Sequence, residues 1–243
     1  MAKKSPLSWF STRATRQSEP IPGAGQVPNS AGGHAWAIDD WSRLHRFLIL
    51  GVDGPTYYAS EHQLVKENAE AVLRCIVLDG KRTVDEIVAV SVSGRNPKQQ
   101  PVVFALAACA AAEDAETRAY ALDALTKVCR TGTQLFLFAG FVEQFRGWGR
   151  GLRRAVGQWY LERDADALAY QLIKYQQREG WSHRDLLRLA KPQPERDSPT
   201  DVALRWAVGK ASEGLPANAP QMLHAYQAAM SAVECRGFSG QGA

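Results

Sequence analysis

The stretch of the chain between residues 146 and 189 carries basic side chains whose spacing suits the binding of phosphate groups. A helix that starts near Trp148 turns by about 100° per residue, so its apolar residues share one face and three arginines share the other. The apolar residues are Leu152, Ala155, Val156 and Trp159, and the arginines are Arg150, Arg153 and Arg154. No carboxylate between Arg146 and Leu161 neutralises these arginines, and guanidinium groups pair well with phosphate oxygens. The arginines therefore form a candidate phosphate-binding face.

Another candidate is a histidine at the predicted start of a helix. Ser182 followed three residues later by Asp185 predicts a capping box, which places the helix start at Ser182. His183 then occupies the first helical position, where free backbone N–H groups and the helix dipole attract anions, and Arg184 lies beside it.

A predicted helix over residues 165–178 adds Lys174 and Arg178, which are four residues apart and so share a polar face. The clustering of these side chains favours an anionic ligand, and duplex RNA is held mainly through phosphates and 2′-hydroxyls. The candidate RNA-binding residues are Arg150, Arg153, Arg154, Lys174, Arg178, His183 and Arg184.

The usual signatures of enzymes and metal sites are absent from the sequence. Gly147, Gly149 and Gly151 alternate, but no G-K-[ST] follows them, so they do not form a nucleotide loop. The five histidines are scattered, and neither G-x-S-x-G nor H-E-x-x-H occurs. The closest sequence to an Asp-x-Ser-x-Ser cation site has Ala89 in place of the aspartate. We therefore expect no catalytic residue, no metal site and no cofactor.

Composition indicates a soluble globular protein with no membrane partner. The 243 residues are 45% hydrophobic, with a net charge of +4 and a pI near 8.9. The longest apolar run, residues 135–142, is far too short to span a bilayer, and no signal peptide precedes it. Cys75, Cys109 and Cys129 lie in apolar helical runs, which predicts buried thiols and a cytoplasmic location.

The periodicity of the chain predicts an all-α fold with about ten helices and no strands. So many helices with short connections favour a HEAT-like helical-repeat solenoid over a four-helix bundle. Thr83 and Glu86 predict a capping box for one of these helices. We expect a disordered leader over residues 1–33, a helical-repeat domain over 34–235 and a frayed tail over 236–243.

Six ordered motifs resemble the TROVE module of the Ro autoantigen family. They are LHRFLILGVDGPTYY, ENAEAVLRCI, KQQPVVFALAAC, VCRTGTQLFLFAGFVE, WGRGLRRAVGQWY and KYQQREGWSHRDLLRL. The resemblance runs from His34 to Lys191, weakens beyond Lys191, and is most specific in GWSHRDLLRL.

The resemblance implies a ring of HEAT-like repeats that takes part in noncoding-RNA quality control without catalysis. In this family Y RNAs bind the basic outer surface, misfolded RNAs pass their 3′ ends through the hole, and bacterial members tether a Y RNA to the exonuclease polynucleotide phosphorylase. His183 resembles the family's Y RNA contact, and the arginines of WGRGLRRA and the segment from Lys174 to Arg178 match its basic positions more loosely. Family members continue into a von Willebrand factor A-type domain with a divalent-cation site. We therefore expect a partial ring here, without that site.

Two functions follow as hypotheses. The first is a Ro-type, noncoding-RNA-binding ribonucleoprotein component that binds Y-like or misfolded small RNAs, with polynucleotide phosphorylase or another exonuclease as a partner and with no affinity for DNA expected. The alternative is a protein-interaction scaffold, since helical solenoids commonly present protein-binding surfaces, which would dock a nuclease.

Overall fold

The computed structural model describes residues 19–23, 25–29, 32–51, 61–178, 180–209 and 214–238. In this part of the chain the helices are α1 (Asp40–Leu50), α2 (Glu61–Leu78), α3 (Gly80–Ser93), α4 (Gln100–Ala111), α5 (Ala115–Asp123), α6 (Leu125–Val128), α7 (Gly132–Phe145), α8 (Arg150–Leu161), α9 (Ala165–Lys174), α10 (His183–Ala190), α11 (Pro199–Ala207) and α12 (Gln221–Phe238). Four short strands form two antiparallel pairs, β1 (Gln26–Pro28) with β2 (His34–Trp36) and β3 (Gln177–Arg178) with β4 (Trp181–Ser182). The helical class is therefore confirmed, and the expectation that the chain has no strands is wrong.

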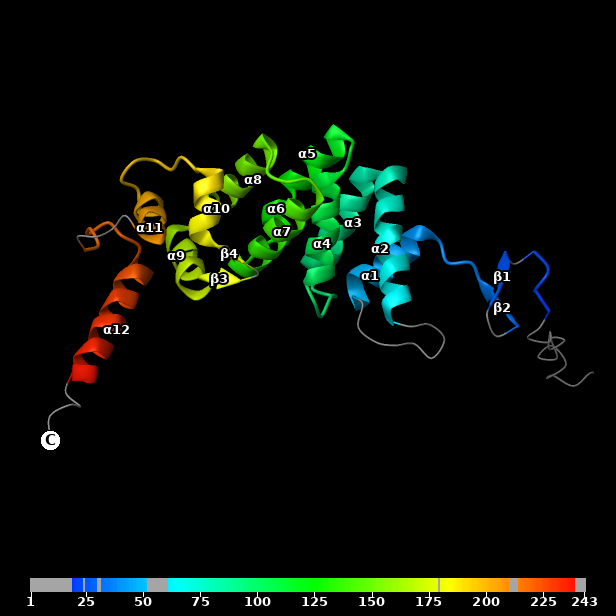
Figure 1. The fold of residues 1–243 in the computed structure, drawn as a ribbon, viewed down its shortest axis with the longest axis horizontal. Helices are drawn as coiled ribbons and strands as arrows, with labels where there is room; N and C mark the ends of the chain where they lie inside the picture. Colours follow the sequence, from blue (N-terminus) through cyan, green and yellow to red (C-terminus); the bar gives the residue numbers. More distant parts are fainter. Residues whose placement is uncertain are drawn as a thin grey trace, which may run out of the picture.

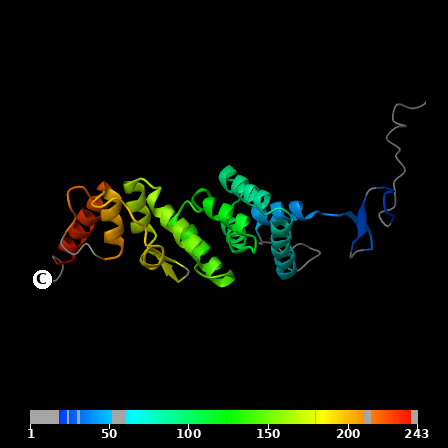
Figure 2. The same cartoon turned by 90° about the horizontal axis from the view of Figure 1, so that it is seen from above.

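The helices follow one another along an elongated body in nearly the order of the sequence (Figure 1). The same order is visible in the perpendicular view, with α1 to α4 towards one end and α12 at the other (Figure 2). The main helix–helix contacts join helices that are no more than three helices apart in the sequence, such as α1 with α2 and α4 with α7. As a result α8, α9 and α10, which carry most of the candidate residues, lie together in the second half of the body.

Side-chain caps define where several helices begin. Asp39 accepts a hydrogen bond from the backbone N–H of Ser42 at 2.6 Å, at the start of α1. Asp79 does the same for Arg82 at 2.9 Å, so α3 begins at Gly80. The predicted cap at Thr83 is therefore wrong. Thr83 is buried in the first turn and donates its hydroxyl to the Asp79 carbonyl at 2.8 Å, because Asp79 already supplies the extended capping residue.

The predicted helix over residues 165–178 ends at Lys174. The chain then forms a β-hairpin in which Gln177 pairs with Ser182 and Arg178 pairs with Trp181. Gly180 has a φ of 79°, in the left-handed region that glycine adopts without strain, and this conformation lets the two strands turn back sharply. The hairpin thereby brings Ser182 into position to cap α10.

The core is centred on α4, in which nine of twelve residues are buried. α4 packs against α3, α5 and α7, and its Phe104 makes edge-to-face contacts with Phe47 at 5.7 Å and Phe141 at 5.4 Å between ring centroids. The predicted burial of the thiols is confirmed for Cys75, Cys109 and Cys129, which are free. Burial raises the pKa of Cys75 to about 11 and that of Cys109 to about 12, so both thiols are protonated at neutral pH.

The ends of the chain differ in part from the predicted boundaries. Residues 1–18 of the expected leader lie outside the described residues, whereas residues 26–28 pair with residues 34–36. At the other end α12 runs to Phe238, three residues into the expected tail. Regular structure therefore extends beyond the interval 34–235 in both directions.

Candidate functional site

The three arginines of α8 lie on its solvent side, as predicted. The opposite face is buried and packs against α5, α6 and α10. Its buried residues are Leu152, Val156, Gly157, Trp159 and Tyr160. Arg150, Arg153 and Arg154, which we call the basic face of α8, are exposed, and none of them forms an ion pair with any described residue. Within the part of the chain that the structure describes, no carboxylate therefore competes with an external anion for this face.

His183, in contrast, is part of the core between α7, α8 and α10. Its side chain is 3% exposed. Its Nδ1 shares a hydrogen bond with the Tyr160 hydroxyl at 2.8 Å, and its ring meets Phe136 edge to face at 4.7 Å between centroids. Its Nε2 has no hydrogen-bond partner among the described residues and approaches Gly132, where an added Cβ would lie 2.9 Å away. An imidazole–phosphate contact would therefore require the ring to leave this position.

Burial also determines the charge of His183. Desolvation lowers the pKa of His183 to about 4, which outweighs the opposite effect of the Gln171 backbone nearby. The imidazole is thus neutral at neutral pH and adds no positive charge to the site. Around it, the capping box of α10 is present as predicted: the Ser182 hydroxyl accepts from the Asp185 N–H, and the Asp185 carboxylate accepts from the Ser182 N–H at 3.1 Å.

A second buried arrangement, which the sequence did not indicate, anchors the end of α8. The Arg163 guanidinium lies 3.4 Å above the centre of the Trp159 ring and donates to the carbonyls of Cys129 and Arg130, each at 3.2 Å. The Trp159 indole N–H also donates to the Cys129 carbonyl. Partial burial lowers the pKa of Arg163 to about 10, so it remains charged at neutral pH. This arginine fixes α8 on α6 and does not belong to the exposed set.

Lys174 and Arg178 do not share a helix face, contrary to the prediction. Lys174 ends α9 and is exposed, and its ammonium lies 2.6 Å from the Tyr170 hydroxyl and within 5.3 Å of the Tyr175 ring centre. Arg178 is exposed on strand β3. The helix stops because the residues after Lys174 extend into the hairpin, which separates the two side chains onto different elements.

The seven candidates are therefore distributed over four elements, α8, α9, β3 and α10. Arg150, Arg153 and Arg154 occupy the first half of α8, while His183 packs at the other end of the same helix, on Tyr160. Seven residues separate Arg153 from Tyr160, roughly 10 Å along the axis at 1.5 Å per residue. Arg184 is exposed at the start of α10, where it lines a cavity of about 260 Å³ together with His183 and Trp206.

Within the described ranges, no three His, Cys, Asp or Glu side chains are placed to hold a metal ion. Ser91, the central residue of the altered cation motif, is buried in α3, and Ser93 donates its hydroxyl to the Val90 carbonyl. None of the described helices combines the length and apolar character needed to cross a membrane.

Comparison with known proteins identifies relatives of most of this chain. The model of the TROVE domain matches residues 27–228, which extends beyond the interval from His34 to Lys191 that contains the six motifs. A protein of Caenorhabditis elegans named RNA-binding protein RO60 is 37% identical over 212 residues, covering 74% of this chain, and the protein of the same name from Deinococcus radiodurans is 41% identical over 186 residues, covering 76%. The crystal structure of the Deinococcus radiodurans RO (RSR) protein superposes with a TM-score of 0.60 at 35% sequence identity, over 74% of this chain.

These relatives are longer than the present chain. The aligned part amounts to 33% and 34% of the two RO60 proteins and to 36% of the chain in the crystal structure. Within this chain, the residues matched by the TROVE domain model nevertheless include α1 to α11 and the first part of α12. The agreement of the domain model, the sequence identities and the superposed fold shows that this chain belongs to the TROVE domain family.

Proposed function

We propose that this chain binds structured noncoding RNA through phosphate contacts made by the basic face of α8. The observation that carries the proposal is the exposure of Arg150, Arg153 and Arg154 on one helix face, without an ion pair among the described residues. Exposed guanidiniums form paired hydrogen bonds with phosphates, whereas arginines already bonded to carboxylates would first have to break those bonds. The names of the two RO60 relatives, which describe them as RNA-binding proteins, support the same ligand class.

The neighbouring elements extend the proposed surface. Arg184 on α10, Lys174 on α9 and Arg178 on β3 are all exposed, and α10 packs directly against α8. His183 would contribute without contacting the RNA. Its ring holds the start of α10 against Tyr160 and so positions Arg184. The chain would then serve as a non-catalytic, Ro-type ribonucleoprotein component for Y-like or misfolded small RNAs in RNA quality control, with an exonuclease such as polynucleotide phosphorylase as its partner. Its helices would form part of a HEAT-like solenoid.

The proposal is tested by RNA binding across a salt series. The variant Arg150→Glu/Arg153→Glu/Arg154→Glu should bind a structured small RNA more weakly, and its dependence of log Kd on log salt should be shallower by about one unit for each phosphate that the variant no longer neutralises. A charge-matched control is Arg46→Glu/Arg95→Glu/Arg196→Glu, which reverses three exposed arginines on other parts of the molecule. Of these, Arg196 pairs with Asp197 at 3.6 Å. Circular dichroism of both variants should match that of the parent protein.

Two results would contradict the proposal. Unchanged affinity and salt slope in the α8 variant would remove the basic face from the interface. An equal reduction of affinity in the α8 variant and in the control would mean that only net charge matters. The scaffold alternative has its own outcome: a protein partner that is still retained after ribonuclease treatment, and by the α8 variant, would favour protein docking over RNA binding.

A further inference from the structure

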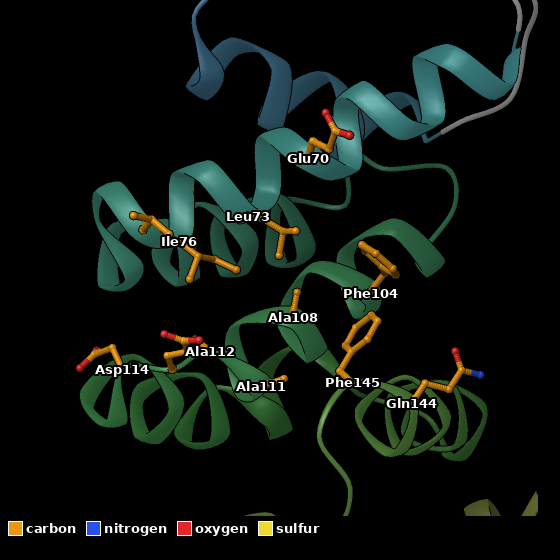
Figure 3. Close-up of a pocket in the computed structure, with 12 residues that line it drawn as sticks. Glu70, Leu73, Ile76, Phe104, Ala108, Ala111, Ala112, Asp114, Gln144 and Phe145 are labelled. Carbon is orange, nitrogen blue, oxygen red and sulfur yellow. The ribbon is translucent and has the colours of Figure 1, made fainter.

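An apolar groove of about 850 Å³ lies between α2, α4 and α7, on elements other than those that form the basic face (Figure 3). Leu73, Ile76 and Val77 of α2 form one wall, Phe104 and Ala108 of α4 form the floor, and Phe145 of α7 closes the other side. Phe104 and Phe145 meet edge to face, with 5.4 Å between ring centroids, so aromatic rings line one end of the groove.

The apolar side chains of this groove are exposed to an unusual extent. Leu73 is 56% exposed, Val77 is 87% exposed and Phe145 is 41% exposed. They converge on one concavity, whereas scattered apolar residues on a surface need no explanation. A contiguous apolar patch that is rimmed by polar groups marks a place where another chain segment or a ligand is bound.

The rim of the groove is acidic. The ionisable residues that line it are Glu70, Glu113 and Asp114. Glu70 pairs with Arg74 at 3.8 Å, whereas Glu113 and Asp114 form no ion pair with a described residue. Asp114 accepts a hydrogen bond from the backbone N–H of Thr117 at 2.7 Å, and hydrogen bonding by Thr117 lowers the pKa of Asp114, so its carboxylate is charged at neutral pH. Arg118 donates to the carbonyls of Ala112 and Glu113, and Arg146 donates to the carbonyl of Ala112. These two guanidiniums are held by backbone carbonyls next to the rim and do not line the groove. An occupant of this groove should therefore combine large apolar side chains with positive charge.

We propose that the occupant is the N-terminal segment of this same chain, residues 3–16. The segment contains three large apolar residues and four basic ones, and no acidic residue precedes Glu19. The apolar residues are Leu7, Trp9 and Phe10, and the basic residues are Lys3, Lys4, Arg13 and Arg16. In the proposed complex the apolar residues fill the floor of the groove and the basic residues face its acidic rim.

The connectivity of the chain supports an occupant in cis. The hairpin of β1 and β2 lies at the end of the body where α1 and α2 are found (Figure 1). The nine residues from Phe10 to Glu19 can span roughly 30 Å when extended. Because the segment is attached to the same molecule, its local concentration at the groove exceeds that of a free peptide.

The direct test is photo-crosslinking from position 9 in the full chain without RNA, with p-benzoylphenylalanine in place of Trp9. The expected product is an intramolecular crosslink, in monomeric protein, to peptides of α2 or α7 that contain Val77 or Phe145. Crosslinks that form elsewhere, or no crosslink at all, would overturn the proposal. Crosslinks found only in dimers would also overturn it and would assign the groove to a second copy.

Variants of the groove separate docking from nonspecific proximity. Leu73→Asp/Val77→Asp should abolish the crosslink while leaving the melting temperature nearly unchanged, because both side chains are mostly exposed. The control is Val92→Asp on α3, a residue that is 62% exposed and does not line the groove, and it should keep the crosslink. Deletion of residues 1–18 should increase the binding of an apolar fluorescent dye, and this increase should be absent in the Leu73→Asp/Val77→Asp background. A crosslink that survives in the groove variant, or dye binding that the deletion does not change, would contradict the proposal.

Discussion

His183 and Arg184 are neighbours in the chain but occupy opposite environments. The imidazole is enclosed by aromatic rings of α7 and α8, whereas the guanidinium next to it faces solvent. A phosphate approaching α10 from solvent would therefore meet Arg184 before it could meet His183. The same contrast occurs in α8 and just after it, where Arg153 is exposed and Arg163 is stacked on Trp159. At the level of single residues, a basic side chain between residues 146 and 189 is therefore not necessarily part of the exposed site.

The buried imidazole makes the stability of the protein depend on pH in a defined window. Burial lowers the pKa of His183 from 6.5 to about 4, so between these pH values the unfolded chain binds a proton that the folded chain does not. The free energy of unfolding should therefore fall as the pH decreases from about 6.5 to 4, by up to about 3 kcal/mol from this group.

Urea denaturation of the parent protein and of His183→Gln at several pH values in this window tests the expectation. The variant cannot take up the proton, so its stability should vary less steeply with pH than that of the parent. Parallel curves for the two proteins would show that His183 titrates normally and is therefore not enclosed as described.

At the scale of elements, the close approach of two helices limits the size of the residues at their contact. Gly80 opens α3 and is buried against α5, where a Cβ at Gly80 would lie 2.0 Å from the Thr117 hydroxyl oxygen. Thr117 itself is 4% exposed, so its side chain is enclosed by the protein. Glycine is therefore needed here for the contact between the two helices, and no left-handed backbone angle is involved.

We expect Gly80→Ala to destabilise the protein by about 1–3 kcal/mol, the usual effect of forcing an extra carbon into a packed contact. The double variant Gly80→Ala/Thr117→Ala removes the two nearest clashing atoms, Oγ1 and Cγ2, and leaves only the Cβ of residue 117, at 2.8 Å. It should therefore be more stable than the sum of the two single changes predicts. Thermal or urea unfolding of the two single variants and the double variant measures this coupling. Strict additivity would indicate that the contact with Thr117 is not what excludes a larger residue.

At the scale of the whole molecule, the serial arrangement of helices makes stability uneven along the body. α4 is almost entirely buried and contacts α1, α3, α5 and α7. α12 packs mainly on α9, and of its described side chains only Leu223 is buried. An element with few buried side chains can open without unfolding the rest.

Hydrogen exchange followed by mass spectrometry should therefore show a gradient of protection. Amides of α4 and α7 should exchange slowest, near the rate set by global unfolding, and those of α12 should exchange fastest among the longer helices with described side chains. Equal protection of α4 and α12 would mean that the described part of the chain unfolds as a single cooperative unit.

The sequence by itself determined the local features of this protein. The apolar repeat of α8 predicted its buried and exposed faces, the pair Ser182 and Asp185 predicted the start of α10, and six motifs indicated the family that the comparisons confirm. These features depend on residues three or four positions apart, or on motifs that are continuous in the sequence.

Only the tertiary structure decided which candidates are exposed and which surfaces come together. His183 is buried because Phe136 and Tyr160, which are 47 and 23 residues away in sequence, enclose it. Arg178 leaves the helix of Lys174 because β3 pairs with β4, and the apolar groove exists because α2, α4 and α7 converge. Burial and pairing of this kind are decided by the elements that pack against a residue, and no spacing within one segment encodes them.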